Sequence, residues 1–105
     1  MSSAALKSLK RKFQSLKSKL EEIVDGVTQS VEKLDSVVTE LGTFYSYDGV
    51  AADYLYCEGN KNYLSNLLET LNNEVLPKIN SEIRSLNIKI REVEAQENSF
   101  NNFFD

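Results

Sequence analysis

The first half of the chain contains the stretch that decides the fold. Residues 6–45 read LKSLKRKFQSLKSKLEEIVDGVTQSVEKLDSVVTELGTFY. A large apolar residue recurs there every seven positions, at Leu6, Phe13, Leu20, Val27, Leu34 and Leu41. Apolar companions follow at +3 (Leu9, Leu16, Ile23) and, from the middle onward, at +4 (Val24, Val31, Val38, Tyr45). Residues three and four positions apart lie on one face of a helix. The change from +3 to +4 companions is what a straight helix requires, because a seven-residue repeat drifts around it by about 20° per heptad. The stretch predicts one amphipathic helix over about residues 4–45.

A chain reversal is predicted directly after this helix. Asp48-Gly49 is typical of turns, because glycine accepts positive φ and aspartate can cap the helix that follows. The helical period then resumes from Tyr63 to Val93, across weak points at Gly59 and Pro77. We therefore expect an all-α antiparallel two-helix hairpin as a single domain, 1–105. Its turn should span 46–50, and helix 2 about 51–97, broken or kinked near Gly59 and Pro77. A flexible tail should follow at 98–105.

Composition argues against catalysis. The chain has 105 residues, no His and a single Cys, Cys57, so it lacks the commonest general base and cannot form an internal disulfide. No pattern points to catalytic, cofactor-binding or metal-binding residues, and we expect a protein that is not an enzyme. The N-terminal apolar residues are separated by charges, which excludes the apolar core of a cleavable signal peptide.

Charge is distributed unevenly along the chain. The first twenty residues carry six Lys and Arg and no acid, while the whole chain has a net charge of −4. In a hairpin this basic end lies beside Glu82, Glu92, Glu94 and Glu97, and such pairs favour the antiparallel arrangement. An acidic partner surface and a membrane surface are the alternatives. Nucleic acid is disfavoured, because the chain is acidic overall and no aromatics are interleaved with the lysines.

Several apolar residues widen the helical stripes beyond what two helices can cover. They predict an interface with the helices of a partner. The candidate interface residues are Val37, Tyr54, Tyr56, Leu67, Leu76 and Ile88.

The turn contains the most specific motif, Tyr47-Asp48-Gly49, followed by the small residues Ala51 and Ala52. It resembles the central motif of the Trp-x-Gly (WXG or ESX-like) helical-hairpin proteins of type VII secretion, with Tyr47 in place of Trp. Within them the chain is most similar to the small helical partner proteins of LXG toxins in the type VIIb systems of Gram-positive bacteria. The likeness covers length, central motif and two-helix architecture.

This resemblance implies a targeting factor with chaperone-like character. The chain would bind the N-terminal helical domain of an LXG toxin, together with a possible second small helical protein, and promote its export. It would lie in the cytoplasm before export, follow a route that reads no cleavable signal, and meet the membrane only through the secretion apparatus. A homo-oligomer is possible when the chain is alone.

The resemblance also points to recognition residues. Phe44 and Asp48 fit a Phe-x-x-x-Asp pattern of these partners, and turn packing with a helix cap is the alternative explanation. The tail residues Phe100, Phe103, Phe104 and Asp105 are candidates for an export signal, against a docking strand or a frayed end.

Two other functions remain open at this stage. One is a structural coiled-coil subunit of a scaffold or tethering complex, in which the turn motif is incidental. The other is a peripheral membrane binder that uses the basic helix.

Overall fold

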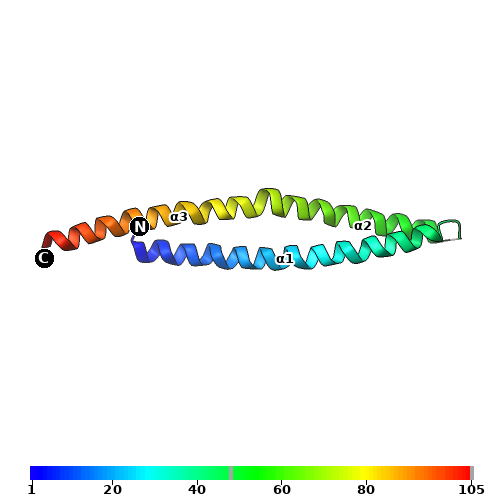
Figure 1. Ribbon diagram of the computed structural model, residues 1–105, viewed down its shortest axis with the longest axis horizontal. Helices are drawn as coiled ribbons and strands as arrows, with labels where there is room; N and C mark the ends of the chain where they lie inside the picture. The colour runs from blue at the N-terminus through cyan, green and yellow to red at the C-terminus, as the bar shows by residue number, and fades with distance from the viewer. Residues whose placement is uncertain (48, 105) are drawn as a thin grey trace. The chain divides into compact units, whose positions relative to one another are not determined.

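The computed structural model describes residues 1–47 and 49–104, with the backbone alone for residues 102–104, and it confirms the all-α class. Its elements are α1 (Ser3–Thr43), α2 (Val50–Thr70), the π-helical turn η1 (Leu71–Val75) and α3 (Leu76–Phe104) (Figure 1). Within the described residues there is no strand.

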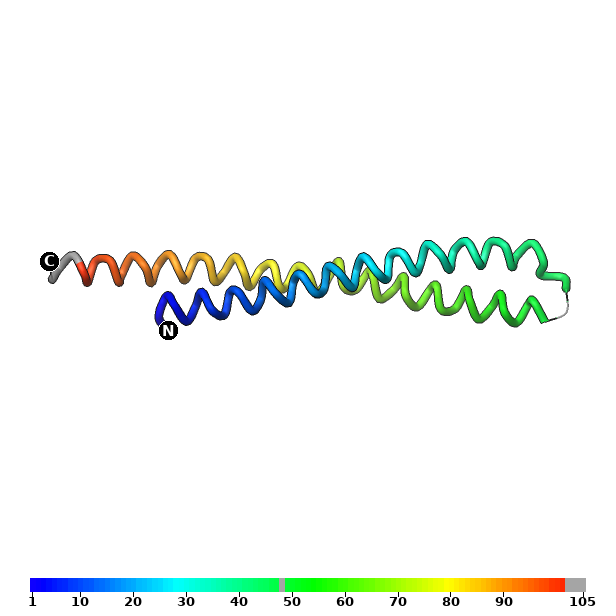
Figure 2. Tube along the Cα trace, turned by 90° about the horizontal axis from the view of Figure 1, so that it is seen from below, coloured from blue at the N-terminus to red at the C-terminus, as the bar shows by residue number. Residues whose placement is uncertain are grey.

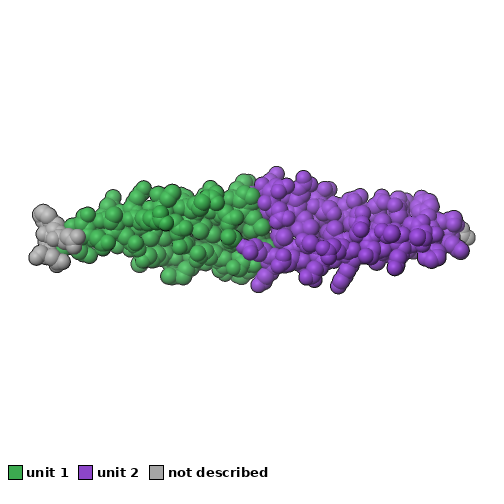
Figure 3. Space-filling view, viewed as in Figure 1, with its two compact units in different colours: residues 1–20, 75–105 green, residues 21–74 purple. Residues whose placement is uncertain are grey.

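The chain divides into two compact units (Figure 3). The terminal unit comprises residues 1–20 and 75–105, and the hairpin unit comprises residues 21–74. In the terminal unit the start of α1 lies beside α3, and in the hairpin unit the rest of α1 lies beside α2 (Figures 1 and 2). The predicted pairing of antiparallel helices is thus present within each unit.

Two serines organise the start of α1. The Ala5 N–H donates to Ser2 Oγ (3.2 Å), so Ser2 caps the helix. The Ser3 N–H and hydroxyl donate to the two carboxylate oxygens of Glu97, at 3.2 and 2.8 Å. These bonds from Ser3 lower the pKa of Glu97. The stabilisation is therefore present above the unfolded-state pKa of the carboxyl and is lost as pH falls through its folded-state value.

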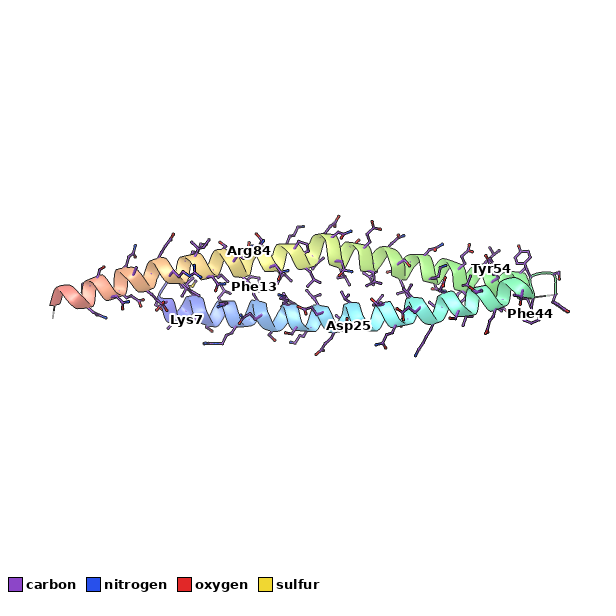
Figure 4. All side chains as sticks on the ribbon, viewed as in Figure 1. Lys7, Phe13, Asp25, Phe44, Tyr54 and Arg84 are labelled. Atoms are coloured by element: carbon purple, nitrogen blue, oxygen red, sulfur yellow. The ribbon has the colours of Figure 1, made fainter. Side chains whose placement is uncertain are left out.

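The terminal unit has a small apolar core. Leu6, Leu86 and Ile90 form its buried cluster, and Leu9, Phe13 and Val93 pack against it. Figure 4 shows Phe13 between the two helices of this unit. At the rim, Lys7 pairs with Glu94 (2.6 Å), which is one of the predicted contacts between the basic end and the acids of helix 2.

Two tyrosine rings are in contact near the turn of the hairpin unit. The rings of Tyr45 and Tyr54 meet edge to face at 5.5 Å, and a Cβ added at Gly42 would lie 3.5 Å from the Tyr54 ring. Gly49 is the N-cap residue of α2 with φ 83°, a conformation that glycine adopts without the steric penalty of a side chain. Glycine at position 49 allows the left-handed backbone conformation from which α2 begins.

Several boundaries differ from those predicted. α1 ends at Thr43, and Phe44 and Tyr45 donate their N–H groups to the carbonyls of Leu41 and Gly42 in tighter turns. α2 passes through Gly59 as continuous helix, because one glycine costs a helix only about 1 kcal/mol. A break at Gly59 is therefore absent, and a kink there stays a prediction.

The region before Pro77 carries the irregular turn η1. Proline removes one helical donor and clashes with the carbonyl four residues back, and a π-helical turn is one way for a helix to absorb such a defect. The kink predicted near Pro77 stays a prediction. The predicted tail at 98–105 is helical as far as Phe104, because no Gly or Pro interrupts the chain after Pro77. Asp105 lies outside the described residues.

Candidate partner-binding surface

The two helices of the hairpin unit meet along a thin seam. Val38 is its only buried side chain within the described residues, with 7% of its surface exposed, and α2 contains no buried residue. The other seam positions are half-buried: Val24, Val27, Val31, Leu34 and Leu41 from α1, and Tyr54, Cys57, Lys61, Leu64 and Leu68 from α2. Such a seam leaves most of each helix surface accessible.

The seam divides the hairpin unit into two sides that can be defined by sequence. One residue rotates a helix by about 100°, so positions just before and just after a seam residue project to opposite sides. Because α1 and α2 are antiparallel here, positions that precede the seam in either helix lie on the same side. We call this the leading side, and the side formed by positions that follow the seam the trailing side.

The leading side carries exposed apolar residues from both helices. They are Ile23 and Val37 from α1, and Tyr56, Tyr63 and Leu67 from α2. Tyr56 and Tyr63 are 75% and 69% exposed. Gly26, Ser30 and Asn60 lie among them, and the charged residues of this side are Lys33, Glu40 and Asp53. Two tyrosines flanked by aliphatic residues on one side are typical of the anchors of a protein interface.

The trailing side is mainly polar and acidic. Its residues are Asp25, Thr28, Glu32, Asp35 and Thr39 from α1, and Glu58, Asn62, Ser65, Glu69 and Asn72 from α2. Leu55, which follows Tyr54 near the turn, is the exception among the described residues: it is apolar and 58% exposed. Lys61 of the seam reaches Asp35 with an Nζ–Oδ1 distance of 3.2 Å. A hydrogen bond with Glu58 is the main cause that raises the pKa of Tyr54. The contrast between the sides predicts that an apolar partner binds the leading side in preference to the trailing side.

Three predicted interface residues lie on the leading side: Val37, Tyr56 and Leu67. Tyr54 instead is half-buried in the hairpin unit, where its ring packs edge to face against Tyr45. In the terminal unit, Leu76 is half-buried and Ile88 is exposed on the outer face of α3. The leading side also includes Ile23 and Tyr63, which the sequence pattern had placed in the helical seams.

The turn carries an exposed aromatic pair. Phe44 and Tyr47 have ring centroids 5.9 Å apart, and Figure 4 shows Phe44 at the turn end of the hairpin unit. Asp48, the acidic member of the predicted motif, lies outside the described residues. Phe44 is thus exposed, and its predicted role in recognition with Asp48 stays a prediction.

The candidate tail residues lie on or beyond the end of α3. Phe100 is exposed and lines a shallow depression with Gln96, Glu97 and Asn101. Phe103 and Phe104 belong to the helix by their backbone, but their side chains, like Asp105, are outside the described part of the chain. The export role of these residues stays a prediction.

No comparison identifies a relative. The chain matches no protein-family model, no curated protein and no solved structure. Among the described residues no three His, Cys, Asp or Glu side chains are grouped to hold a metal ion. None of the helices, as far as they are described, has the length and apolar character needed to span a membrane. The strongest functional feature is therefore the apolar leading side.

Proposed function

We propose that the chain is a non-enzymatic targeting partner that binds the N-terminal helical domain of an LXG toxin and promotes its export through a type VIIb secretion system. Binding uses the leading side of the hairpin unit. One or more helices of the toxin pack on Ile23, Val37, Tyr56, Tyr63 and Leu67 and extend the two-helix pairing into a bundle. Phe44 at the turn end remains available as a recognition element.

The observation that carries this proposal is that exposed large apolar residues are concentrated on the leading side, which has five, whereas Leu55 stands alone on the described part of the trailing side. The five large apolar side chains on the leading side are exposed, while the trailing side has acids and small polar residues at the equivalent positions. A helix that is apolar on more than one face is normally covered on more than one face. α2 has Tyr54, Leu64 and Leu68 toward α1 and a second apolar set on the leading side, so a further helix fits there.

The class of partner is proposed from the resemblance of the turn motif. Tyr47 and Gly49 occupy the aromatic-x-Gly positions of the type VII hairpin proteins, and Gly49 has the positive φ that the reversal uses. The resemblance, rather than any measured contact, names the LXG toxin. A coiled-coil scaffold subunit is the competing function. A version of it in which the whole chain forms one continuous helix is disfavoured by the antiparallel helices of the hairpin unit.

The test is co-expression of the tagged chain with the products of neighbouring genes, followed by pull-down and mass measurement in solution. We expect a complex of defined mass that contains a toxin with a long helical N-terminal domain. A toxin truncated to that domain should be retained, and the remainder of the toxin should not. Failure of every neighbouring product to co-purify, with the chain folded and recovered, would contradict the proposal.

A further inference from the structure

The terminal unit contains a groove lined by basic side chains from both of its helices. Its polar lining residues are Lys7, Lys10, Arg11 and Gln14 from α1, and Asn87 and Arg91 from α3. The groove has a volume of about 420 Å³, and Figure 4 shows the position of Lys7 near the start of α1. We call it the basic groove. All of its residues belong to the terminal unit, so its geometry is independent of the hairpin unit.

The apolar core of the terminal unit explains why these side chains converge. The lining residues of α1 are separated by three or four positions, and so are those of α3, so each set shares one face of its helix. Lys7, Asn87 and Arg91 each follow directly after a residue of the buried cluster. Because the two helices are antiparallel, positions that follow the core residues lie on the same side of the unit. Packing of the core therefore brings the two basic sets together.

Three of the four cations of the basic groove have no acidic partner. Lys7 pairs with Glu94, with an Nζ–Oε1 distance of 2.6 Å. Among the residues that the structure describes, Lys10, Arg11 and Arg91 form no ion pair. Lys10 is half-buried, and both arginines are exposed. Like charges gathered on one helical face repel one another, so an anion in the groove would remove an unfavourable interaction from the terminal unit.

The concentration of positive charge favours phosphate groups over carboxylates as the ligand. A phosphate group carries about −1.5 to −2 charges near neutral pH, whereas a carboxylate carries a single charge. Two linked phosphates therefore bring about three negative charges into a small volume, which matches the three unpaired cations. An acidic peptide has to distribute the same charge along its backbone. Guanidinium groups, in addition, bind two phosphate oxygens at once through their planar fork.

We propose that the basic groove binds a ligand with two linked phosphate groups. The phosphate oxygens accept hydrogen bonds from Arg11 of α1 and Arg91 of α3, and Lys10 adds a third positive charge. The amides of Gln14 and Asn87 provide further N–H donors to the same ligand. The phosphates belong either to a soluble diphosphate or to the headgroup of a lipid that carries two phosphates.

Titration calorimetry of the full chain with pyrophosphate tests the site. We expect a Kd of about 0.1 mM or tighter in about 0.15 M NaCl, where only charges close to the ligand contribute strongly. Orthophosphate should bind at least about tenfold more weakly, because it has one phosphate group. Arg11→Gln/Arg91→Gln should weaken pyrophosphate binding at least about tenfold, because it removes both guanidinium groups. Arg11→Lys/Arg91→Lys keeps the charge without the fork and should have an intermediate affinity.

A matched control separates the basic groove from the general positive charge of the terminal unit. Lys12→Gln/Lys89→Gln also removes one charge from each helix, at positions outside the groove lining. It should leave the Kd for pyrophosphate within about threefold of the native value, because the lost charges are screened from the ligand. All four substituted side chains are exposed, so both glutamine pairs should keep the helical signal and the Tm of the native chain.

Vesicles of phosphatidylcholine with and without cardiolipin, a lipid with two phosphates, distinguish the two sources of the ligand. Pyrophosphate binding that requires the two arginines assigns the groove to a soluble diphosphate. Flotation with cardiolipin vesicles that requires the same arginines, without pyrophosphate binding, assigns it to a lipid headgroup. The proposal is overturned if neither probe binds, if the arginine and lysine pairs have equal effects, or if a hexaglutamate peptide binds as tightly as pyrophosphate. None of these outcomes depends on toxin binding.

Discussion

Replacing Tyr56 and Tyr63 together with alanine should weaken binding of the LXG domain by about 100-fold or more. Both rings are exposed on the leading side, and buried tyrosines at interface centres each cost about 2 kcal/mol or more when truncated. Because neither ring is buried in the chain alone, the free energy of unfolding of the variant should stay within about 0.5 kcal/mol of the native value. Titration calorimetry with the purified domain measures the affinity, and thermal unfolding checks the fold.

Two further variants give this prediction its controls. Tyr56→Phe/Tyr63→Phe keeps the apolar rings and should retain most of the affinity if packing, rather than the hydroxyl groups, supplies the energy. Asn62→Ala/Glu69→Ala alters the trailing side of the same helix and should change the affinity less than about threefold. Equal losses from the two alanine pairs would show that the leading side is not the interface.

Leu86→Ala should be the most destabilising single substitution in the terminal unit. Leu86 is 4% exposed and lies in the cluster with Leu6 and Ile90, so its truncation leaves a cavity at the contact between α1 and α3. Such changes cost about 2–5 kcal/mol, a large part of the stability of a chain of this size. The expected fall in Tm is on the order of 10 °C or more, measured by circular dichroism at 222 nm.

The matched control for this substitution is two residues away. Ile88 lies on the same helix, is 56% exposed and contacts no core cluster, so Ile88→Ala should change the free energy of unfolding by less than about 0.5 kcal/mol. Similar losses for Leu86→Ala and Ile88→Ala would mean that the outer face of α3 is covered in the chain alone, for example by self-association.

The helices themselves were predictable because their apolar period is strong. The series from Leu6 to Leu41 predicted α1 to within two residues, and its seam residues do face the opposite helix in each unit. Leu16 and Ile23 are more exposed than that pattern implied. They belong to the +3 companions, which drift away from the seam in a straight helix as the +4 companions replace them.

Side-chain environments were harder to predict than helices. Tyr54 was predicted to lie on the partner interface, but its ring packs on Tyr45, and only the reversal of the chain brings these two residues together. The leading side could have been found from sequence by comparing the residues before and after each seam position. The comparison applies only if the two helices are antiparallel, because only that arrangement places Val37 and Tyr56 on the same side of the seam. The helical end of α3 was missed because residues 98–105 have no apolar period, which was the signal that predicted the other helical segments.

The central claim is that the leading side of the hairpin unit contacts the toxin, and site-specific thiol labelling tests it most directly. Asn60 lies on the leading side between Tyr56 and Tyr63, Asn62 lies on the trailing side, and both are exposed. In a Cys57→Ala background, Asn60→Cys and Asn62→Cys are labelled with a maleimide, with and without the LXG domain. The account predicts that the toxin domain slows labelling at position 60 at least about tenfold and leaves position 62 nearly unchanged. Protection at position 62 with none at position 60, in a complex that forms, would contradict it.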